Sequence, residues 1–134
     1  GLKQLVAYVA SNAAGCRYCQ AHTSANAAHT GVGADKIEHA FEFETHAAFS
    51  DAERAALRLA RDSALVPNLV EAGHFAALRE HFEEPQIVEL VAVCALFGFL
   101  NRWNDTMSTE LEEIPRTFAE AHLDGAGWDV GKHR

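Results

Sequence analysis

Apolar and small residues recur every three or four positions along most of the chain, and no stretch of strand length alternates between apolar and polar residues. This spacing places the apolar side chains on one face of an α-helix, and the many alanines favour helices further. The pattern predicts an all-α fold, a bundle of about six helices. The predicted helices are Leu2–Ala14, Cys16–Gly31, Ala34–Phe43, Ser50–Ala64, Asn68–Phe82 and Pro85–Met107.

Local signals mark several of the helix ends. Ser50 is followed three residues later by Glu53, the pattern of a capping box, and Gly31 is well placed as a C-cap. Pro85 suits the first position of the last predicted helix. Beyond Met107 no further helix is predicted, because a polar stretch leads to Pro115 and the tail from Gly125 is expected to be irregular.

The long C-terminal helix is unusual because Leu90–Leu100 is apolar on every face. A helix at the surface of a globular protein keeps polar residues on one side, so this helix is expected to be buried all round. In a short chain such burial is most easily reached against other subunits, and we therefore expect a homo-oligomer. The apolar run is far shorter than the roughly 20 residues that a membrane helix needs, so no membrane span is expected.

Composition indicates an ordinary globular protein. With 134 residues, 49% hydrophobic and 22% charged, one domain is expected. The 11 Lys and Arg residues against 19 Asp and Glu give a net charge of -8, which opposes binding to nucleic acid or anionic lipid. No signal peptide pattern precedes the first helix, so a cytoplasmic protein is expected. The chain begins at Gly1, without Met and inside an apolar pattern, which fits a piece of a longer protein as well as a whole one.

Candidate chemistry is concentrated at the start of the second predicted helix. Cys16 and Cys19 are three residues apart there, and His22 follows one turn later. Free N–H groups and the dipole at a helix N-terminus stabilise a thiolate, and two thiols at this spacing can close a small disulfide. In a chain without an export signal such a pair favours redox chemistry or metal binding over a structural disulfide. The third cysteine, Cys94, lies in an apolar run and is expected in the core.

Metal and haem sites fit the spacing poorly. A structural zinc site needs four ligands, and no second ligand pair accompanies Cys16, Cys19 and His22. Attachment of a c-type haem requires His directly after the second cysteine, where the chain has Gln20. No strand precedes the pair, as it would in a thioredoxin-like site. We therefore expect no metal and no cofactor other than a redox-active Cys16–Cys19 disulfide.

Three segments carry a resemblance to a known family. Leu2–His22, Asn101–Asp105 and Gly127–His133 resemble the alkylhydroperoxidase D-like branch of the carboxymuconolactone decarboxylase family, and the similarity covers nearly the whole chain. It implies one all-helical, oligomeric domain over residues 1–134 and the activity of an antioxidant hydroperoxide reductase or disulfide reductase. It also implies that Cys19 is the peroxidatic cysteine, that Cys16 resolves the sulfenic acid, and that an external dithiol such as a lipoyl group reduces the disulfide.

The chain departs from the family pattern at three positions of its proton relay. Gln4 stands in place of a glutamate, and Tyr18 and Thr23 each replace a histidine. His22 lies roughly 60° around the helix from Cys19, so it is the candidate acid and thiolate stabiliser. The candidate pocket residues are Gln4, Tyr18, Thr23, Asn101 and Arg102.

Two other functions remain open at this point. The chain could be a non-catalytic helical oligomer whose cysteines are reduced and structural. It could also be an enzyme of the carboxymuconolactone decarboxylase type, a branch that acts without this cysteine pair. Reactive thiols would favour the reductase, whereas packed and inert thiols would favour the alternatives.

Overall fold

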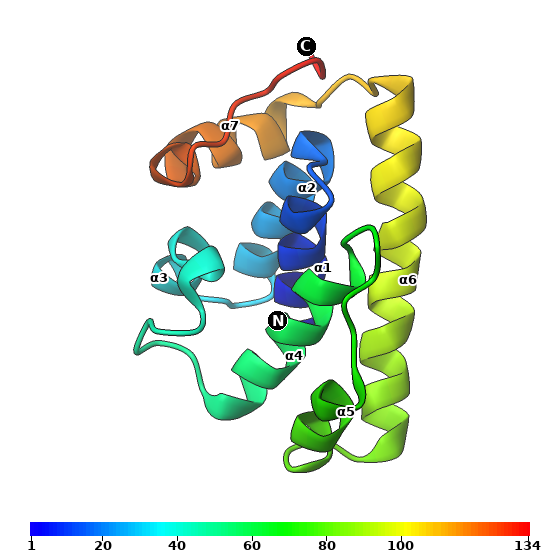
Figure 1. Ribbon diagram of the computed structural model, residues 1–134. Coiled ribbons are helices and arrows are strands. Elements are labelled where there is room, and N and C mark those ends of the chain that lie inside the picture. Colours follow the sequence, from blue (N-terminus) through cyan, green and yellow to red (C-terminus); the bar gives the residue numbers. More distant parts are fainter.

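The computed structural model describes residues 1–134 and contains helices but no strand, which confirms the all-α prediction. Figure 1 shows the arrangement. The α-helices are α1 (Leu2–Ala13), α2 (Arg17–His29), α3 (Ala34–Glu38), α4 (Asp51–Ser63), α5 (Ala72–Arg79), α6 (Glu84–Met107) and α7 (Glu113–His122). Two short 3₁₀ helices, η1 (Ala40–Glu42) and η2 (Asp124–Ala126), complete the structure.

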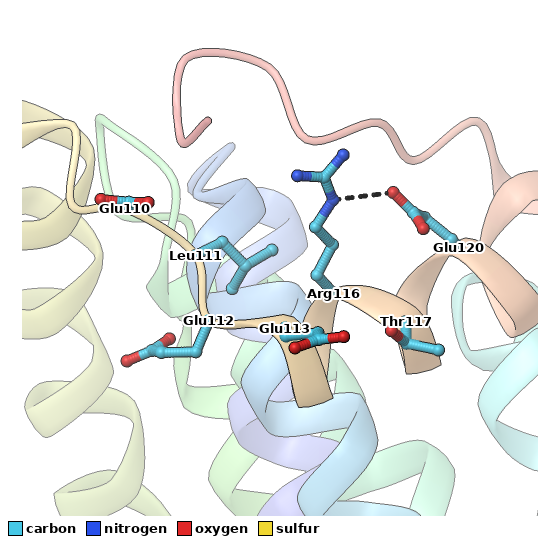
Figure 2. A pocket seen from close by; sticks show the side chains of 7 residues that line it. All are labelled: Glu110, Leu111, Glu112, Glu113, Arg116, Thr117 and Glu120. Atoms are coloured by element: carbon cyan, nitrogen blue, oxygen red, sulfur yellow. Dashed lines mark hydrogen bonds and ion pairs between the residues drawn. The ribbon is translucent and has the colours of Figure 1, made fainter.

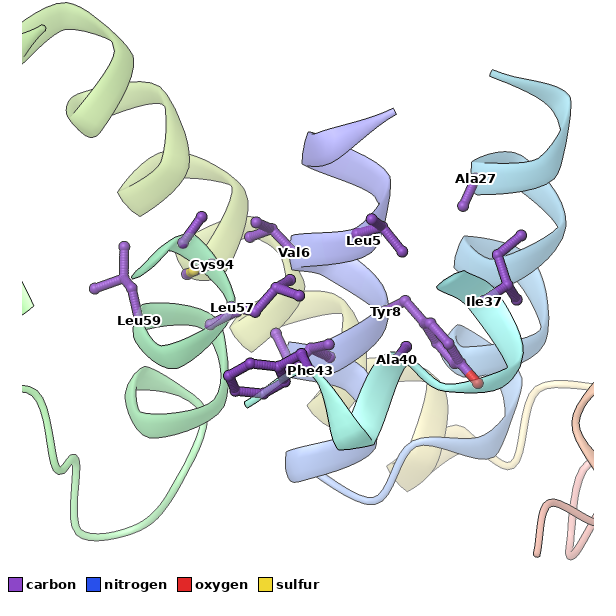
Figure 3. Close-up of a cluster of buried hydrophobic side chains, with 14 of the residues drawn as sticks. Leu5, Val6, Tyr8, Ala27, Ile37, Ala40, Phe43, Leu57, Leu59 and Cys94 are labelled. Carbon is purple, nitrogen blue, oxygen red and sulfur yellow. The ribbon is translucent and has the colours of Figure 1, made fainter. Parts of the chain in front are cut away.

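Helix α1 is the centre of the core, because α2, α4 and α6 all pack against it. Its side chains Leu5, Val6 and Tyr8 are buried, and they lie among Phe43 and Leu57 from later elements (Figure 3). Cys94 belongs to the same cluster, as the sequence predicted. Burial of α1 on nearly every side fixes the position from which α2 starts.

Two predicted helices are shorter than expected. The segment predicted as Ala34–Phe43 is α helix only to Glu38 and continues, after His39, as η1. The segment predicted as Asn68–Phe82 is helical only from Ala72 to Arg79. There the Asn68 side chain accepts the Val70 N–H at 2.9 Å, a local turn that competes with a helix.

Helix α7 was not predicted, and it matters for the site. It is short, and its first turn contains Pro115, which has no N–H to leave unpaired. Pro115 and Ala119 are buried on one face, and α7 packs mainly against α2. Since short helices depend on tertiary packing for most of their stability, the local sequence gave a weak signal for α7.

Helix α6 is buried along one face only. Ile87, Leu90, Cys94 and Asn101 face the protein. The opposite face leaves large apolar side chains exposed, so burial all round is not reached within one chain and the homo-oligomer stays a prediction. By length and composition alone α6 could also cross a membrane, which is weak evidence for a single helix; 17% of its most apolar window is buried.

The capping box at Ser50 gives a direct test of the fold. The Ser50 side chain accepts the Glu53 N–H at 3.2 Å, and the Glu53 carboxylate accepts the Ser50 N–H at 2.8 Å. We expect Ser50→Ala to lower the free energy of unfolding by about 1 kcal/mol in urea denaturation, because one helix N–H loses its partner. Ser50→Asp, which keeps an acceptor, should stay near the wild type. Equal stability of all three proteins would contradict the capping role.

Candidate active site

The cysteine pair is held where α1 turns into α2. Gly15 has a φ of 77°, a left-handed conformation that glycine adopts without strain. The turn makes Cys16 the N-cap of α2, and its N–H donates to the Ser11 carbonyl oxygen at 3.0 Å. The Cys16 Sγ accepts the Cys19 N–H at 3.3 Å. Both cysteines are free thiols and both are buried.

The two thiols differ in acidity. Interaction with the Cys19 thiol, helped by the Cys19 N–H, lowers the pKa of Cys16 despite its burial. Interaction with Cys16 and burial raise the pKa of Cys19. When the dithiol loses its first proton, the negative charge therefore lies mainly on Cys16 and the remaining proton on Cys19. Cys16 is the sulfur that the helix N-terminus stabilises as a thiolate.

Asn104, near the end of α6, provides a polar contact to the other sulfur. Its Nδ2 lies 3.8 Å from the Cys19 Sγ and also donates to the Leu100 carbonyl oxygen at 3.1 Å. The Thr109 hydroxyl donates to the Asn104 Oδ1 at 3.0 Å, which fixes which end of the amide faces the sulfur. The contact opposes the rise in the pKa of Cys19. Asn104 is thus an oriented donor for any negative charge that develops on Cys19.

Glu112, the residue before α7, joins two predicted site residues. Its Oε2 lies 2.8 Å from the His22 Nε2, and its Oε1 accepts the Tyr18 hydroxyl at 3.2 Å. The rings of Tyr18 and His22 pack against each other, with centroids 4.5 Å apart. The Glu112 carboxylate is well placed to accept a hydrogen bond from a protonated His22 Nε2. In that tautomer the His22 Nδ1 carries no proton and can act as a base.

Hydrogen bonds and burial also determine the protonation of Glu112 and Tyr18. Bonds to its own backbone N–H, and then to His22 and Tyr18, hold the pKa of Glu112 below its ordinary value. Burial, followed by the neighbouring Glu112 carboxylate, raises the pKa of Tyr18 to about 12. Near neutral pH the cluster therefore consists of a carboxylate, a neutral phenol and the His22 imidazole.

The C-terminal tail packs against the helices that hold the cysteine pair. His133 is fully buried, with its Nδ1 2.8 Å from the Thr109 carbonyl oxygen and its Nε2 3.7 Å from the Asp105 Oδ1. Trp128 donates its ring N–H to the Arg17 carbonyl oxygen at 3.1 Å, in the first turn of α2. Apart from η2 the tail is irregular, as predicted, yet it packs tightly against the start of α2 and the end of α6.

The other predicted site residues differ in their burial and in their hydrogen-bond partners. Thr23 donates its hydroxyl to the Cys19 carbonyl oxygen at 2.6 Å, so this group is engaged with the backbone rather than with a substrate. Gln4 is on α1, and its Oε1 is buried without a hydrogen-bond partner. Asn101 is buried and neither side-chain polar atom has a partner, whereas Arg102 is exposed.

Two cavities flank the cysteine region. One, of about 390 Å³, lies between α6 and the segment after α4, and its lining includes Asn101, Arg102, Asp105 and Val66. Asp105 lines this cavity, and its negative charge is one of the smaller causes that raise the pKa of both thiols. The prediction that Asn101 and Arg102 line a pocket together is consistent with this arrangement.

The other cavity, of about 590 Å³, surrounds the start of α7. Figure 2 shows Arg116 paired with Glu120, with Glu110 and Glu112 on the segment that leads into α7. Its lining is Glu110, Leu111, Glu112, Glu113, Arg116, Thr117 and Glu120. With four carboxylates against one guanidinium, this side of the site disfavours anionic ligands.

Glu112, Asp105 and His133 belong to this region but were not among the predicted site residues. Glu112 looked like one of many solvated carboxylates, and its side chain is indeed 60% exposed. It acts on His22 only because α7 docks on α2, a contact between residues 90 positions apart. Pro115, a residue suited to the first turn of a helix, was the one sequence signal that could have drawn attention to this segment.

The coupling of the two thiols predicts opposite pKa changes in two variants. In Cys19→Ala the pKa of Cys16 should rise, because the interaction that lowers it most is lost. In Cys16→Ala the pKa of Cys19 should fall, because Cys16 is the main cause of its increase. Ultraviolet titration of the thiolates, with Cys94 replaced by Ala in both proteins, measures each value separately. Unchanged values in both variants would exclude the coupling.

Comparison with known proteins shows which family and which solved structures the chain is similar to. Residues 1–62 match the model of the carboxymuconolactone decarboxylase family. The uncharacterized protein YnjA of Escherichia coli (strain K12) is 28% identical over 101 residues, which are 75% of this chain and 56% of YnjA.

Two solved structures of the debrominase Bmp8 are also similar. The apo form is 40% identical with a TM-score of 0.83, covering 92% of this chain and 64% of Bmp8. A cysteine-to-alanine variant in complex with 2,3,4-tribromopyrrole is 38% identical, also with a TM-score of 0.83, covering 90% and 64%. The chain therefore spans less than two thirds of the length of these relatives. Residues 1–62 thus resemble the carboxymuconolactone decarboxylase family, and the chain shares the all-helical fold of Bmp8.

Proposed function

We propose that this chain is a dithiol oxidoreductase, in which Cys16 and Cys19 supply two electrons to a small bound acceptor and close as a disulfide. The observation that carries the proposal is the asymmetric pair at the start of α2. One sulfur is stabilised as a thiolate by the helix N-terminus, and the other lies beside an oriented amide donor. Two cysteines that only fill space in the core would not require this difference between their polar surroundings.

A hydroperoxide is the acceptor that we favour. The His22 Nδ1 takes the proton of Cys19, and the Cys19 thiolate attacks the terminal peroxide oxygen. The O–O bond breaks, the alkoxide takes that proton from His22, and Cys19 becomes a sulfenic acid. The Cys16 thiolate then attacks the Cys19 sulfur, and the hydroxide released takes a proton from solvent. The sum is one hydroperoxide and two thiols giving an alcohol, water and a disulfide.

The roles of the two cysteines follow from the family resemblance and from their acidity. Cys16 is 0% exposed and Cys19 is 3% exposed, so both are buried, and the assignment of Cys19 as the sulfur that a substrate meets first rests on the resemblance. The lowered pKa of Cys16 suits a resolving group, because it increases the share of Cys16 that is thiolate at a given pH. An external dithiol must then reduce the disulfide, and a reducing compartment such as the cytoplasm would keep the pair in its thiol form.

A halogenated aromatic compound is a second candidate acceptor. It is favoured by the likeness to Bmp8, a debrominase of which a cysteine variant was solved with 2,3,4-tribromopyrrole. The same dithiol would replace bromine by hydrogen, with an aryl bromide and two thiols giving an arene, hydrogen bromide and a disulfide. Both candidate acceptors are neutral, which suits the acidic rim near Glu112.

Single-turnover chemistry tests the proposal. Pre-reduced protein should consume one equivalent of an organic hydroperoxide per chain. We expect Cys19→Ser to abolish consumption and Cys16→Ser to allow one turnover that stops at sulfenic acid, which a dimedone-type trap would detect. Cys94→Ser, a change of a buried thiol elsewhere in the core, is the matched control and should react like the wild type.

Other outcomes of the same experiment separate the alternatives. Inertness to hydroperoxide with release of bromide from 2,3,4-tribromopyrrole would assign the dithiol to dehalogenation. If the protein reacts with neither acceptor and all thiols are alkylated slowly, the proposed oxidoreductase activity is contradicted. A structural cysteine pair or a decarboxylase-type enzyme would then explain the chain better.

Glu112 should act as a positioning residue for His22. We expect Glu112→Gln to slow the first turnover by roughly tenfold, a fraction of what acid–base catalysis supplies. The same change should lower the pKa of Tyr18 from about 12 toward its ordinary 10.0, because a neighbouring negative charge is removed. Glu113→Gln changes the adjacent carboxylate and is the control. A normal rate in Glu112→Gln with a shifted Tyr18 titration would exclude the positioning role.

A further inference from the structure

We propose that His133, in the C-terminal tail, is a positioning residue for Cys19 that acts through Thr109 and Asn104. The His133 ring holds Thr109 in place, and Thr109 in turn keeps the N–H end of the Asn104 amide toward the Cys19 sulfur. The role in catalysis rests on the proposed function, because it requires that Cys19 reacts. The geometry itself does not depend on which acceptor the chain uses.

The bond to Thr109 fixes the orientation of the His133 ring. The His133 Nδ1 lies 2.8 Å from the Thr109 carbonyl oxygen, and since a carbonyl oxygen only accepts, Nδ1 carries a proton. The His133 Nε2 is buried without a hydrogen-bond partner, and the Asp105 Oδ1 at 3.7 Å is too far away to form one. The side chain is 0% exposed, so no solvent replaces the Thr109 contact.

His133 holds the segment after α6 at a second point as well. The His133 carbonyl oxygen accepts the Leu111 N–H at 2.9 Å. Helix α6 ends at Ser108, whose φ of 51° is left-handed, so the residues that follow leave the helical hydrogen-bond pattern. Two contacts from the tail therefore fix residues 109–111, which lie between α6 and α7.

Thr109 connects this contact to the cysteine pair. Its hydroxyl donates to the Asn104 Oδ1 at 3.0 Å, and its N–H donates to the Asn104 carbonyl oxygen at 3.2 Å. The Asn104 Nδ2 then faces the Cys19 Sγ at 3.8 Å. An amide turned the other way would present an oxygen to the sulfur and oppose negative charge there. A donor that is oriented before the reaction needs no rearrangement when charge develops on Cys19.

Two other roles for His133 fit the contacts less well. A general base must lie within hydrogen-bond reach of the group whose proton it takes, and the His133 Nε2 contacts no such group. Nor is His133 the main anchor of the tail. Trp128 donates to the Arg17 carbonyl oxygen at 3.1 Å, and Arg17 pairs with Asp129 at 2.9 Å. These contacts hold the tail on α2 whatever residue stands at position 133.

The pKa of Cys19 measures the positioning without any substrate. The variants are made in a Cys16→Ala, Cys94→Ala background, where Cys19 is the remaining thiol, and alkylation by iodoacetamide is followed against pH. We expect His133→Gln to raise the pKa of Cys19, because the Asn104 contact that opposes its increase is weakened. His133→Asn carries an amide N–H near the position of Nδ1 and should leave the pKa of Cys19 unchanged.

Further variants separate positioning from packing. His133→Phe keeps a buried ring without the N–H and should raise the pKa of Cys19 as His133→Gln does. Thr109→Val removes the hydroxyl and should also raise it, and adding His133→Gln should raise it no further, because both act through Asn104. His29→Ala, which removes an exposed imidazole at the end of α2, is the control and should match the background.

Turnover tests the consequence for catalysis. In the chain with all three cysteines, His133→Gln should slow the first turnover with an organic hydroperoxide by about tenfold, and His133→Asn should restore it. Because alkylation needs no acceptor, the pKa comparison decides the positioning role even if the chain is inert to hydroperoxide. Such inertness would contradict the proposed function alone.

Three results would overturn the positioning role. The pKa of Cys19 would stay unchanged in both His133→Gln and His133→Phe, or it would rise equally in His133→Asn, which would assign the effect to the shape of the ring. Additive increases in the Thr109→Val, His133→Gln double variant would show that the two residues act on Cys19 separately. Circular dichroism confirms folding, and if His133→Gln does not fold, His133→Phe replaces it in each comparison.

Discussion

The hydrogen bond from the Cys19 N–H to the Cys16 Sγ is the contact on which the rest of the site depends. It exists because Gly15 ends α1 in a left-handed turn and makes Cys16 the N-cap of α2. The Cys19 thiol is the largest cause that lowers the pKa of Cys16, and the Cys19 N–H at the start of the helix lowers it further. The neighbouring Cys19 keeps its proton to higher pH. The two thiols therefore differ in acidity although both are cysteines.

The surroundings of the pair come from parts of the chain far away in sequence. Asn104 on α6 faces the Cys19 sulfur, and Glu112 before α7 faces His22. The proton relay that the resemblance implies is altered at Gln4, Tyr18 and Thr23, and Thr23 is turned to the backbone. A carboxylate is nevertheless present, because Glu112, the residue before α7, contacts the His22 imidazole of α2.

Sequence reasoning succeeded where the signal was local. The capping box at Ser50, the apolar spacing of α1 and the cysteine pair at the start of α2 depend on residues a few positions apart, and all are present. It failed where distant contacts decide the structure, as in α7, which is stabilised by packing on α2. Glu112 was missed for the same reason, since nothing near it in sequence indicates that it meets His22 across 90 positions. The early end of α3 and the late start of α5 follow from turns that compete with a helix.

Whether Cys16 and Cys19 join when an acceptor oxidises them is the question that decides the proposed function. The most direct measurement is intact mass with peptide mapping, after reduction, addition of one equivalent of organic hydroperoxide and alkylation of the remaining thiols. We expect the loss of two hydrogens, a linked Cys16–Cys19 peptide and an alkyl group on Cys94 only once the protein is unfolded. Alkylation of all three cysteines with no loss of hydrogen would contradict a redox-active pair.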